Sequence, residues 1–324
     1  MNDKMDHSHN KPPLIIISGS TGSGKSDIAL KLAKKIDGEI ISADSVAVYK
    51  GLDIGSAKPE DRMLKEIRHH LIDILEPDEY FGVDTFIRYA EEALNDILSR
   101  GKIPIMVGGT AFYIQAFIYG VDLSEEIEHD DSFRNMLYDK AEGSDGKLKL
   151  YERLKEVDPD YALSVHPNNV KRVVRALEYN HYTGKLFSEY NHIQSLRESE
   201  YDHLYFALTY ERDILYKRID RRVDLMIEAG LADEVRTLLN AGLDRDLNSM
   251  SSIGYKEMAA YICGECSLED AIADIKKNSR HYAKRQLTWL RRERDVDMIV
   301  REDNDEVKVI EYIISKAKES GLIP

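Results

Sequence analysis

Cysteine is scarce in this sequence, with two in 324 residues. Cys263 and Cys266 form a C-x-x-C pair, which supplies two thiolates where a structural zinc site needs four ligands. A redox pair of this kind lies between a strand and a helix, whereas this pair separates two helical patterns. The sequence therefore predicts a turn between two helices at this point. Without other cysteines it also predicts no disulfide framework, as is usual in a reducing compartment.

Long hydrophobic runs and a signal peptide are absent as well. No stretch reaches the roughly 18 consecutive apolar residues that indicate a membrane-spanning helix. The opening "MNDKMDHSHNKPP" is polar and lacks the apolar core of a secretory signal, so we expect a disordered lead-in over residues 1–13. These absences favour a soluble, cytoplasmic protein with no membrane partner, and we expect a monomer.

Positive charge is in the minority. The chain has 45 Lys and Arg against 59 Asp and Glu, a formal net charge of −14. This balance argues against a general nucleic-acid coating protein, because phosphate contacts are made by Lys and Arg. The stretch "KKNSRHYAKRQLTWLRRER" at residues 276–294 nevertheless carries eight Lys or Arg against one Glu. A single basic helix in an acidic chain predicts a local site for a polyanion.

The stretch "GSTGSGKS" at residues 19–26 is a glycine-rich loop. It follows the apolar run Leu14–Ile17 and precedes a helical pattern at Asp27–Ile36, which is the context that a P-loop requires. Backbone N–H groups of such a loop bind an anion, Lys25 adds a charge, and Ser26 can place its hydroxyl on a magnesium ion. The alternative is a glycine turn that only caps a helix. The loop alone leaves open whether the anion is ATP, GTP or another diphosphate.

The first 120 residues alternate short apolar runs with amphipathic stretches, as βαβ units do. Strands are predicted at Leu14–Ser18, Glu39–Ala43, His70–Ile74 and Ile103–Val107, and a helix ending at Gly101 separates the last two. This pattern predicts an α/β fold of the P-loop NTPase-like kind, with a parallel sheet flanked by helices.

After Tyr119 the pattern becomes polar, acidic and helical, which predicts a helical insertion domain over residues 121–200. The run His203–Tyr210 then returns to the sheet. The later elements are helices at Glu211–Ala229, Leu231–Ala241 and Ser267–Arg294, a strand at Val296–Val300 and a terminal helix. The P-loop core is therefore expected to comprise residues 14–120 and 201–324.

Polar residues leave the predicted strands at the edge where a parallel sheet binds ligands. Asp44 either accepts a proton or helps to hold magnesium, or it caps the next turn. Ser45 has the same two interpretations, as a ligand or as a turn hydroxyl. Thr110 can bond a leaving oxygen and also cap the helix that follows it.

The run "IPIMV" ends in Gly-Gly-Thr, whereas the Walker B strand of many P-loop NTPases ends in an aspartate that organises the metal. Unless Asp44 takes this place, the chain lacks the metal-binding aspartate that nucleotide hydrolysis usually needs. The loop can then hold a diphosphate that is released whole as a leaving group. Arg218, Arg221 and Arg222 lie on one predicted helix, either as surface charges or with one arginine on a phosphate.

The motifs resemble one family, the tRNA dimethylallyltransferases, also called tRNA isopentenyltransferases. The resemblance runs from about Leu14 to Arg292 through six blocks in order: "GSTGSGKS", "DSVAVYKGLDIGSAKP", "VGGTAFYIQA", "HPNNVKRVVRALEYNHYTGK", "SSIGYKE" and "AKRQLTWLRR". It implies transfer of a dimethylallyl group from dimethylallyl diphosphate to N6 of adenosine 37, beside the 3′ side of the tRNA anticodon.

The resemblance also implies roles for individual residues. Asp44 would accept the N6 proton, Thr110 would contact the bridging oxygen, and Lys25 and Arg222 would bind the diphosphate. The loop residues that bind diphosphate would be Gly19, Ser20, Thr21, Gly22, Ser23, Gly24, Lys25 and Ser26, with the cofactor Mg²⁺ on Ser26. The anticodon stem-loop would contact Asp44, Ser45, Val46, Ala47, Arg134, Lys171, Arg172, Arg175, Ser251, Ser252, Ile253, Gly254, Tyr255, Lys256, Lys284, Arg285, Gln286, Trp289 and Arg291.

The chain departs from the family pattern at three positions. Ser20 and Gly22 stand where the family often has Pro and Ala, and Ala47 stands where many members have Gln. Three other functions remain open: prenylation of free adenine nucleotide, phosphorylation of a small molecule with Asp44 as base, and a nucleotide-dependent switch. The basic blocks at Lys171–Arg175 and Lys276–Arg294 favour tRNA over a mononucleotide.

Overall fold

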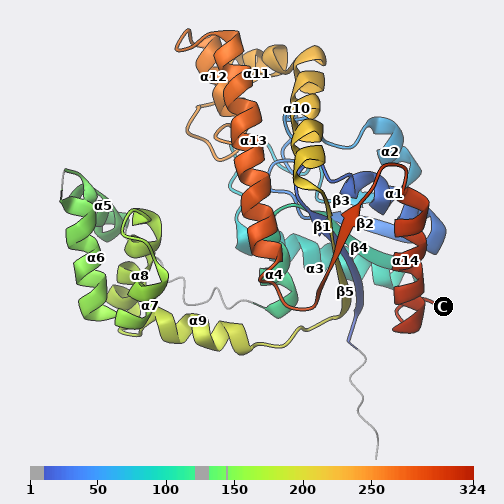
Figure 1. Ribbon diagram of the computed structural model, residues 1–324, viewed down its shortest axis with the longest axis horizontal. Helices are drawn as coiled ribbons and strands as arrows, with labels where there is room; N and C mark the ends of the chain where they lie inside the picture. Colours follow the sequence, from blue (N-terminus) through green and yellow to red (C-terminus); the bar gives the residue numbers. More distant parts are fainter. Residues whose placement is uncertain (1–10, 121–130, 144) are drawn as a thin grey trace, which may run out of the picture. The chain divides into compact units, whose positions relative to one another are not determined.

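The computed structural model describes residues 11–120, 131–143 and 145–324 (Figure 1). These residues form two compact units. One takes in the chain up to Ile118 and again from Glu200 to Pro324, and the other is Tyr119–Ser199. Most of the lead-in predicted for residues 1–13, and the start of the insertion predicted from residue 121, lie outside the described residues.

A six-stranded sheet lies at the centre of the first unit, in the order β3-β2-β4-β1-β5-β6. Its strands are β1 (Pro13–Gly19), β2 (Gly38–Ser42), β3 (His69–His70), β4 (Ile103–Gly108), β5 (Asp202–Tyr210) and β6 (Val296–Arg301). Every neighbouring pair is parallel, which confirms the predicted parallel sheet. All the carboxyl ends of these strands therefore meet at one edge.

Two strand predictions were wrong at their ends. The third strand, predicted over His70–Ile74, pairs only at His69 and His70, because Leu71 and Asp73 take positive φ angles of 62° and 54° that interrupt extended backbone. The first strand begins at Pro13, inside the predicted lead-in. Proline is tolerated at the first residue of a strand, where no N–H is needed.

Helices cover both faces of the sheet (Figure 1). On one face α1 (Lys25–Ile36) and α14 (Glu306–Glu319) pack against alternate strand residues such as Ile15 and Ile17. The helices α3 (Val83–Ser99) and α4 (Ala111–Tyr119) lie on the other face and pack together through stacked Phe86 and Tyr113. None of the helices in the described part of the chain is long and apolar enough to cross a membrane.

The remaining helices of this unit are α2 (Asp61–Glu66), α10 (Arg212–Glu228), α11 (Leu231–Asn240), α12 (Tyr255–Ile262) and α13 (Leu268–Leu290). The long helix α13 opens as predicted, with the Ser267 hydroxyl accepting a hydrogen bond from the Asp270 backbone N–H (3.1 Å). Cys263 and Cys266 are free thiols between α12 and α13, which confirms the predicted turn.

The second unit is helical throughout its described residues. It contains α5 (Asp131–Ala141), α6 (Gly146–Val157), α7 (Pro159–Ser164), α8 (Val170–Thr183) and α9 (Phe187–Leu196). Leucines and valines such as Leu137, Leu154 and Val173 form its own buried core. Asp158 caps α7 by accepting from the Tyr161 N–H (3.0 Å) and also accepts from Ser188 N–H (2.8 Å), so one carboxylate joins α7 to α9.

A buried carboxylate stabilises the sheet at the edge opposite the ligand edge. Glu39 of β2 has a side chain only 5% exposed, and its two oxygens accept hydrogen bonds from both terminal nitrogens of Arg100. His70 Nε2 lies 2.9 Å from the same carboxylate. The Arg100 hydrogen bonds are the main cause that lowers the pKa of Glu39 from 4.5 to about 2, with His70 adding to them against the effect of burial.

We expect Glu39→Gln to lower the free energy of unfolding at pH 7 by about 2–3 kcal/mol, because it removes the buried charge that Arg100 and His70 contact and leaves Arg100 with only its ion pair to Asp96. A lowered carboxyl pKa gives stability that is complete above pH 4.5 and is lost as the pH falls toward 2. Urea unfolding of both proteins should therefore show a difference that shrinks between pH 5 and pH 3. Glu306→Gln, which removes an exposed ion pair with Lys31, is the control and should change stability by less than about 0.5 kcal/mol. Equal losses in the two variants would contradict this role of Glu39.

Candidate active site

The glycine loop follows β1 and leads directly into α1. Gly22 and Gly24 have φ angles of 79° and 78°, in the left-handed region, and Gly24 is the N-cap of α1. At Gly22 a Cβ would also lie 3.2 Å from the Ile219 side chain of α10. Glycine is therefore favoured at both positions, and the loop presents backbone N–H groups at a helix N-terminus, as an anion site does.

Gln286 of α13 joins this loop to the end of β4. Its Oε1 accepts from the Thr21 N–H (2.8 Å) and its Nε2 donates to the Gly109 carbonyl (2.9 Å). The side chain is 6% exposed. We predicted Gln286 as a tRNA contact; both ends of its amide are bonded within the protein, it also lines the pocket described below, and its contact with tRNA stays a prediction. Gln286 fixes the spacing between two segments that line the site.

Asp44 and Thr110 leave neighbouring strands β2 and β4 on the same edge. The ends of these strands are very close, since a Cβ on Gly108 would lie 2.0 Å from the Ala43 carbonyl oxygen. The Thr110 N–H donates to that same carbonyl (3.3 Å). Asp44 Oδ1 accepts from the N–H groups of Val46 (2.9 Å) and Ala47 (3.2 Å), so the turn-capping interpretation holds and the carboxylate is also fixed in orientation.

Of the three arginines predicted on one helix, Arg222 reaches the glycine loop. Its Nη1 donates to the Thr21 hydroxyl (3.0 Å) and its Nη2 to the Ser56 carbonyl (3.5 Å). Arg218 contacts the outer side of the loop, with Nε donating to the Gly22 carbonyl (3.0 Å), whereas Arg221 is exposed. The helix α10 therefore lies along the loop, and its arginines have distinct positions.

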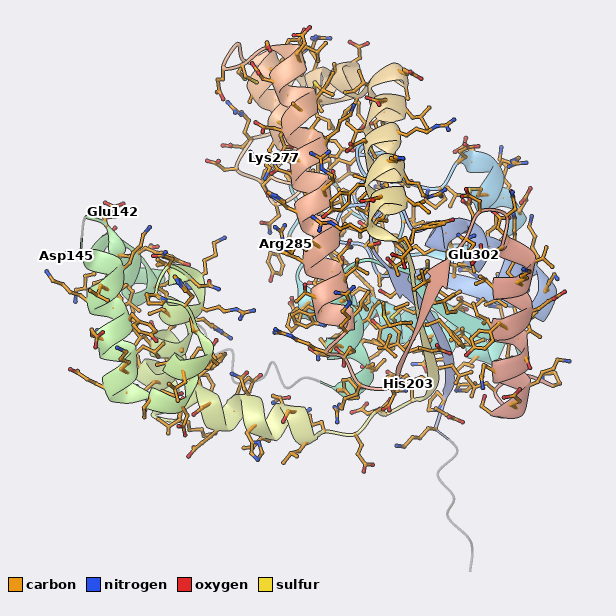
Figure 2. The ribbon with its side chains drawn as sticks, viewed as in Figure 1. Glu142, Asp145, His203, Lys277, Arg285 and Glu302 are labelled. Carbon is orange, nitrogen blue, oxygen red and sulfur yellow. The ribbon has the colours of Figure 1, made fainter. Side chains whose placement is uncertain are left out.

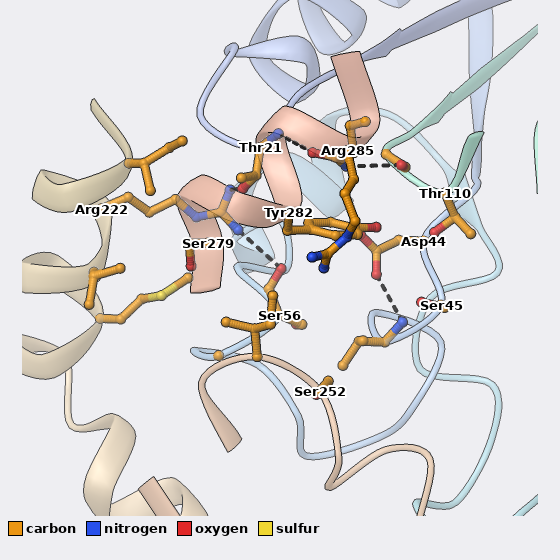
Figure 3. A pocket seen from close by; sticks show the side chains of 18 of the residues that line it. Thr21, Asp44, Ser45, Ser56, Thr110, Arg222, Ser252, Ser279, Tyr282 and Arg285 are labelled. Atoms are coloured by element: carbon orange, nitrogen blue, oxygen red, sulfur yellow. Dashed lines mark hydrogen bonds between the residues drawn. The ribbon is translucent and has the colours of Figure 1, made fainter. Parts of the chain in front are cut away.

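These segments enclose a pocket of about 400 Å³ within the first unit (Figure 3). All four side chains predicted as catalytic, Lys25, Asp44, Thr110 and Arg222, line it. The other lining residues come from the glycine loop, the β2 and β4 ends, α10, the segment before α12 and α13; they include Thr21, Ser45, Val46, Ser56, Met226, Ser251, Ser252, Ile253, Lys256, Ser279, Tyr282, Arg285 and Gln286. The chain thus brings together at one place residues more than 240 positions apart in sequence.

Two of the basic groups that line the pocket, Lys25 and Arg222, have lowered pKa values. Burial, followed by repulsion from Arg222, lowers the pKa of Lys25 from 10.5 to about 8, while Asp44 acts in the opposite direction. Burial also lowers the pKa of Arg222. Two cations held in a partly dehydrated pocket next to free backbone N–H groups would both be stabilised by a multiply charged anion. A diphosphate fits this charge pattern.

Tyr282 is a further residue of the site, outside the set predicted above. It lines the pocket on α13, one helical turn before Gln286, and Figure 3 shows it beside Asp44 and Thr110. Burial is the main cause that raises the pKa of its hydroxyl, with the negative charge of Asp44 adding to it. Its spacing from Gln286, four residues on a helix, was the available signal.

Ser26, predicted as the magnesium ligand, is exposed at the start of α1. It borders a smaller pocket of about 50 Å³ together with Lys25 and Asp44. Within the described residues, no group of three or more His, Cys, Asp or Glu side chains is arranged to hold a metal ion. Mg²⁺ often takes only one or two protein oxygens and completes its shell with phosphate oxygens and water. One hydroxyl beside a diphosphate site fits that requirement.

The segment Ser251–Lys256 divides into pocket-lining and buried parts. Ser251, Ser252, Ile253 and Lys256 line the large pocket. Tyr255 is fully buried, and its hydroxyl donates to Glu234 (2.7 Å), so its side chain supports the segment from within, and its part in tRNA contact stays a prediction. Ala47 is buried as well, and it borders the smaller pocket rather than the large one.

The basic face of α13 lies next to the pocket. Lys284, Arg285 and Arg291 are exposed on it, and Figure 2 shows Arg285 and Lys277 projecting from this helix. Trp289 is only partly exposed, since its ring packs edge-on against Phe112 and its Nε1 donates to Glu293 (3.2 Å). Of these exposed cations Arg285 lines the pocket itself, whereas Trp289 belongs mainly to the packing of the helix.

The remaining predicted tRNA contacts lie in the helical unit. Lys171 and Arg172 are exposed at the start of α8. Arg134 and Arg175 form ion pairs with Glu178, at 3.0 Å and 3.7 Å. Glu178 is 1% exposed, so these two arginines neutralise a buried charge within the unit. Their contact with tRNA stays a prediction.

Comparison with known proteins gives consistent matches over most of the chain. The model of the IPP transferase family matches residues 47–293, and that of isopentenyl transferase matches residues 12–78. The tRNA dimethylallyltransferase of Lachnoclostridium phytofermentans is 45% identical over 96% of this chain and 99% of its own length. That of Geobacillus thermodenitrificans is 46% identical over 94% and 97%.

Solved structures agree with these relatives. A tRNA isopentenylpyrophosphate transferase from Bacillus halodurans is 40% identical, with a TM-score of 0.71 over 96% of this chain and 98% of that one. A eukaryotic dimethylallyltransferase described as acting on tRNA is 31% identical, with a TM-score of 0.79 over 95% and 80%. Together with the glycine loop, Asp44, Thr110 and Arg222 around one pocket, these matches show that the chain belongs to the IPP transferase family, the tRNA dimethylallyltransferases.

Proposed function

We propose that this protein transfers the dimethylallyl group of dimethylallyl diphosphate to N6 of adenosine 37 in tRNA, giving N6-dimethylallyladenosine and diphosphate. One observation carries the proposal: a single pocket places a diphosphate-type loop with two cations beside Asp44 and Thr110. The loop and its two cations suit the diphosphate of the donor. Asp44 suits the acceptor nitrogen, and Thr110 suits the carbon–oxygen bond of the donor that breaks. Family membership supports prenyl transfer over phosphoryl transfer.

The diphosphate of the donor would bind in the glycine loop. Lys25 and Arg222 are the cations next to it, and the backbone N–H groups preceding α1 complete the cradle. As the carbon–oxygen bond of the donor breaks, negative charge develops on the departing diphosphate, and donors already in place stabilise it. The Thr110 hydroxyl, on the same pocket wall, would donate to the bridging oxygen.

Asp44 would act on the acceptor. The Asp44 hydrogen bonds from Val46 and Ala47 involve Oδ1, which holds the carboxylate so that Oδ2 faces the substrate. The N6 nitrogen attacks the first carbon of the prenyl group, the bond from that carbon to diphosphate breaks, and the N6 proton passes to Asp44. The adenine ring must enter the pocket to reach Asp44, so the adenosine has to leave its stack in the anticodon loop.

Mg²⁺ would be held by the Ser26 hydroxyl and the donor's phosphate oxygens. When bound, it would neutralise part of the diphosphate charge. The anticodon stem-loop would lie against the exposed face of α13, at Lys284, Arg285 and Arg291, and against Lys171 and Arg172 of the helical unit. These exposed cations supply phosphate contacts that the acidic remainder of the chain does not.

The proposal is tested by incubating the protein with prenyl-labelled dimethylallyl diphosphate, and separately with γ-labelled ATP, against total tRNA and AMP. We expect label from the prenyl donor in tRNA alone. Prenyl label in AMP would indicate an adenylate prenyltransferase instead. Label from ATP in any acceptor, with none from the prenyl donor, would indicate a kinase and contradict the proposal.

Asp44→Ala should lower turnover by about 10²- to 10⁴-fold, the usual contribution of general-base catalysis, with tRNA affinity retained. Single-turnover rates and filter binding would measure the two effects separately. Asp37→Asn is the control, because Asp37 is an exposed carboxylate at the far end of α1 with a left-handed backbone that asparagine tolerates. A rate for Asp44→Ala within about tenfold of the original would remove Asp44 from the role of base.

The affinity for dimethylallyl diphosphate should weaken as the pH rises above about 8. Lys25 has its pKa lowered to about 8 in the free protein, so its cationic form, which binds the anion, predominates below that pH and is lost above it. The Michaelis constant for the donor, measured from pH 7 to 10 at fixed tRNA, would show the bend. Lys25→Arg keeps its charge over this range and should flatten the profile. A bend that persists in Lys25→Arg would assign it to another group.

Lys284→Ala should weaken tRNA binding and reduce the slope of log affinity against log salt by about 1. Binding isotherms between 50 and 300 mM salt would determine the slope. The exposed lysine Lys318, on α14, gives the matched control, since Lys318→Ala removes the same charge away from the pocket. Identical slopes for the two variants would show that α13 does not carry the phosphate contacts.

A further inference from the structure

The outer side of the glycine loop is held by two arginines from distant parts of the chain. Arg218 of α10 donates through Nε to the Gly22 carbonyl (3.0 Å), and Arg301 at the end of β6 donates through Nη1 to the Ser23 carbonyl (3.1 Å). Two consecutive peptide groups of the loop are thus bonded to guanidinium groups. The inner side of the loop, by contrast, faces the pocket through Thr21 and Lys25.

Arg301 is fixed in turn by Asp305. The arginine is 4% exposed, and its Nε and Nη2 both donate to Asp305 Oδ1, at 3.0 Å and 2.7 Å. The second oxygen of Asp305 accepts from the backbone N–H of Glu302 (2.8 Å), which Figure 2 marks at the end of β6. Each part of this guanidinium therefore has a partner, and one of those partners is the loop.

Both arginines also lie over one aromatic ring. The guanidinium carbon of Arg218 is 4.4 Å from the ring centroid of Tyr210, and that of Arg301 is 5.3 Å from it. Tyr210 is the last residue of β5 and is buried. Cation–π contacts at this distance favour the charged form and limit the side chains' motion. The ring therefore keeps both cations at the loop even though their charges repel.

This arrangement fixes the direction of the loop's amide groups. In a trans peptide the C=O and the next N–H point in opposite directions. The bond to the Ser23 carbonyl thus sets the direction of the Gly24 N–H, directly before Lys25. The bond to the Gly22 carbonyl sets that of the Ser23 N–H, which donates to Ser20 (3.2 Å) and closes the turn. Without these bonds, Gly22 and Gly24 have the freedom to rotate the amides away.

We propose that Arg301 and Arg218 are positioning residues that preorganise the glycine loop for the diphosphate of the donor. The proposal rests on the proposed function, in which that loop binds the donor. Neither arginine needs to touch the diphosphate: each acts through a carbonyl on the far side of the same peptides. Arg301 also lies beyond residues 47–293, the segment that the IPP transferase model matches. Preorganisation raises affinity by lowering the conformational cost of binding.

The experiment measures binding of inorganic pyrophosphate with Mg²⁺ to the full-length protein by calorimetry, together with the Michaelis constants for dimethylallyl diphosphate and tRNA. Arg218→Lys and Arg301→Lys keep the charge but remove the guanidinium geometry. The matched control is Arg221→Lys, an exposed arginine three residues further along α10. Thermal unfolding of each variant separates a folding defect from a binding defect.

We expect pyrophosphate affinity and the donor Michaelis constant to weaken about fivefold in Arg218→Lys and about tenfold in Arg301→Lys. The Michaelis constant for tRNA should stay within twofold of the original, which a general structural defect would not allow. Arg301 is buried, so if Arg301→Lys unfolds, exposed Arg218 decides the outcome. The proposal would be overturned if Arg218→Lys had the same melting temperature and the same pyrophosphate affinity as Arg221→Lys.

The original protein serves as the test of the underlying function. If it neither binds pyrophosphate nor transfers the prenyl group, the proposed function fails. If it does both while the loop variants match the control, the function stands and only the positioning role of Arg218 and Arg301 is lost.

Discussion

The two hydrogen bonds of Gln286 are the constraint on which the site depends. They connect the first loop of the chain, at Thr21, to the end of β4, at Gly109, through a helix that comes 265 residues later. Because the amide is buried, losing either bond would leave an unpaired polar group in the interior. The same bonds fix α13 against the sheet edge. Gln286 therefore both lines the pocket and places the basic face of α13 beside it.

Electrostatics explains why this pocket suits an anion better than any neutral ligand. Burial is the main cause that lowers the pKa values of both Lys25 and Arg222, and repulsion from Arg222 lowers that of Lys25 further. Asp44 balances only part of that charge. A diphosphate would supply the missing negative charge, and its departure as a product would restore the repulsion. The overall charge of −14 does not describe this local environment, since a few cations are concentrated around the pocket.

The sequence alone predicted the parallel sheet, the glycine loop and the four side chains that meet in the pocket. The sheet, the loop with Lys25, Asp44 and Thr110 depend on local pattern: a strand followed by glycines, or a polar residue at a strand end. Arg222 was chosen over Arg218 and Arg221 by the family resemblance alone. It could not show which face of α13 is buried. Gln286 and Lys284 are two residues apart in one basic block, yet Gln286 is buried against the glycine loop and Gly109, and Lys284 is exposed.

Tyr255 and His70–Ile74 show the same limit. The tyrosine lies in a block with serines and a lysine that line the pocket, but Glu234, on another helix, holds its hydroxyl inside. The third strand has an apolar pattern, and backbone angles at Leu71 and Asp73 end it after two residues. A tertiary contact determines the burial of Tyr255, and single φ angles determine the length of the third strand. Neither produces a periodic signal in the sequence.

The bond between Arg301 and the Ser23 carbonyl spans 278 residues, and this has a consequence for synthesis of the chain. The glycine loop leaves the ribosome long before the strand that braces it. During translation the loop therefore exists for most of the time without its brace and without Gln286. An incomplete chain, even one that has already formed β1, α1 and β4, would hold the prenyl donor poorly. Donor binding would thus begin only after β6 has been made.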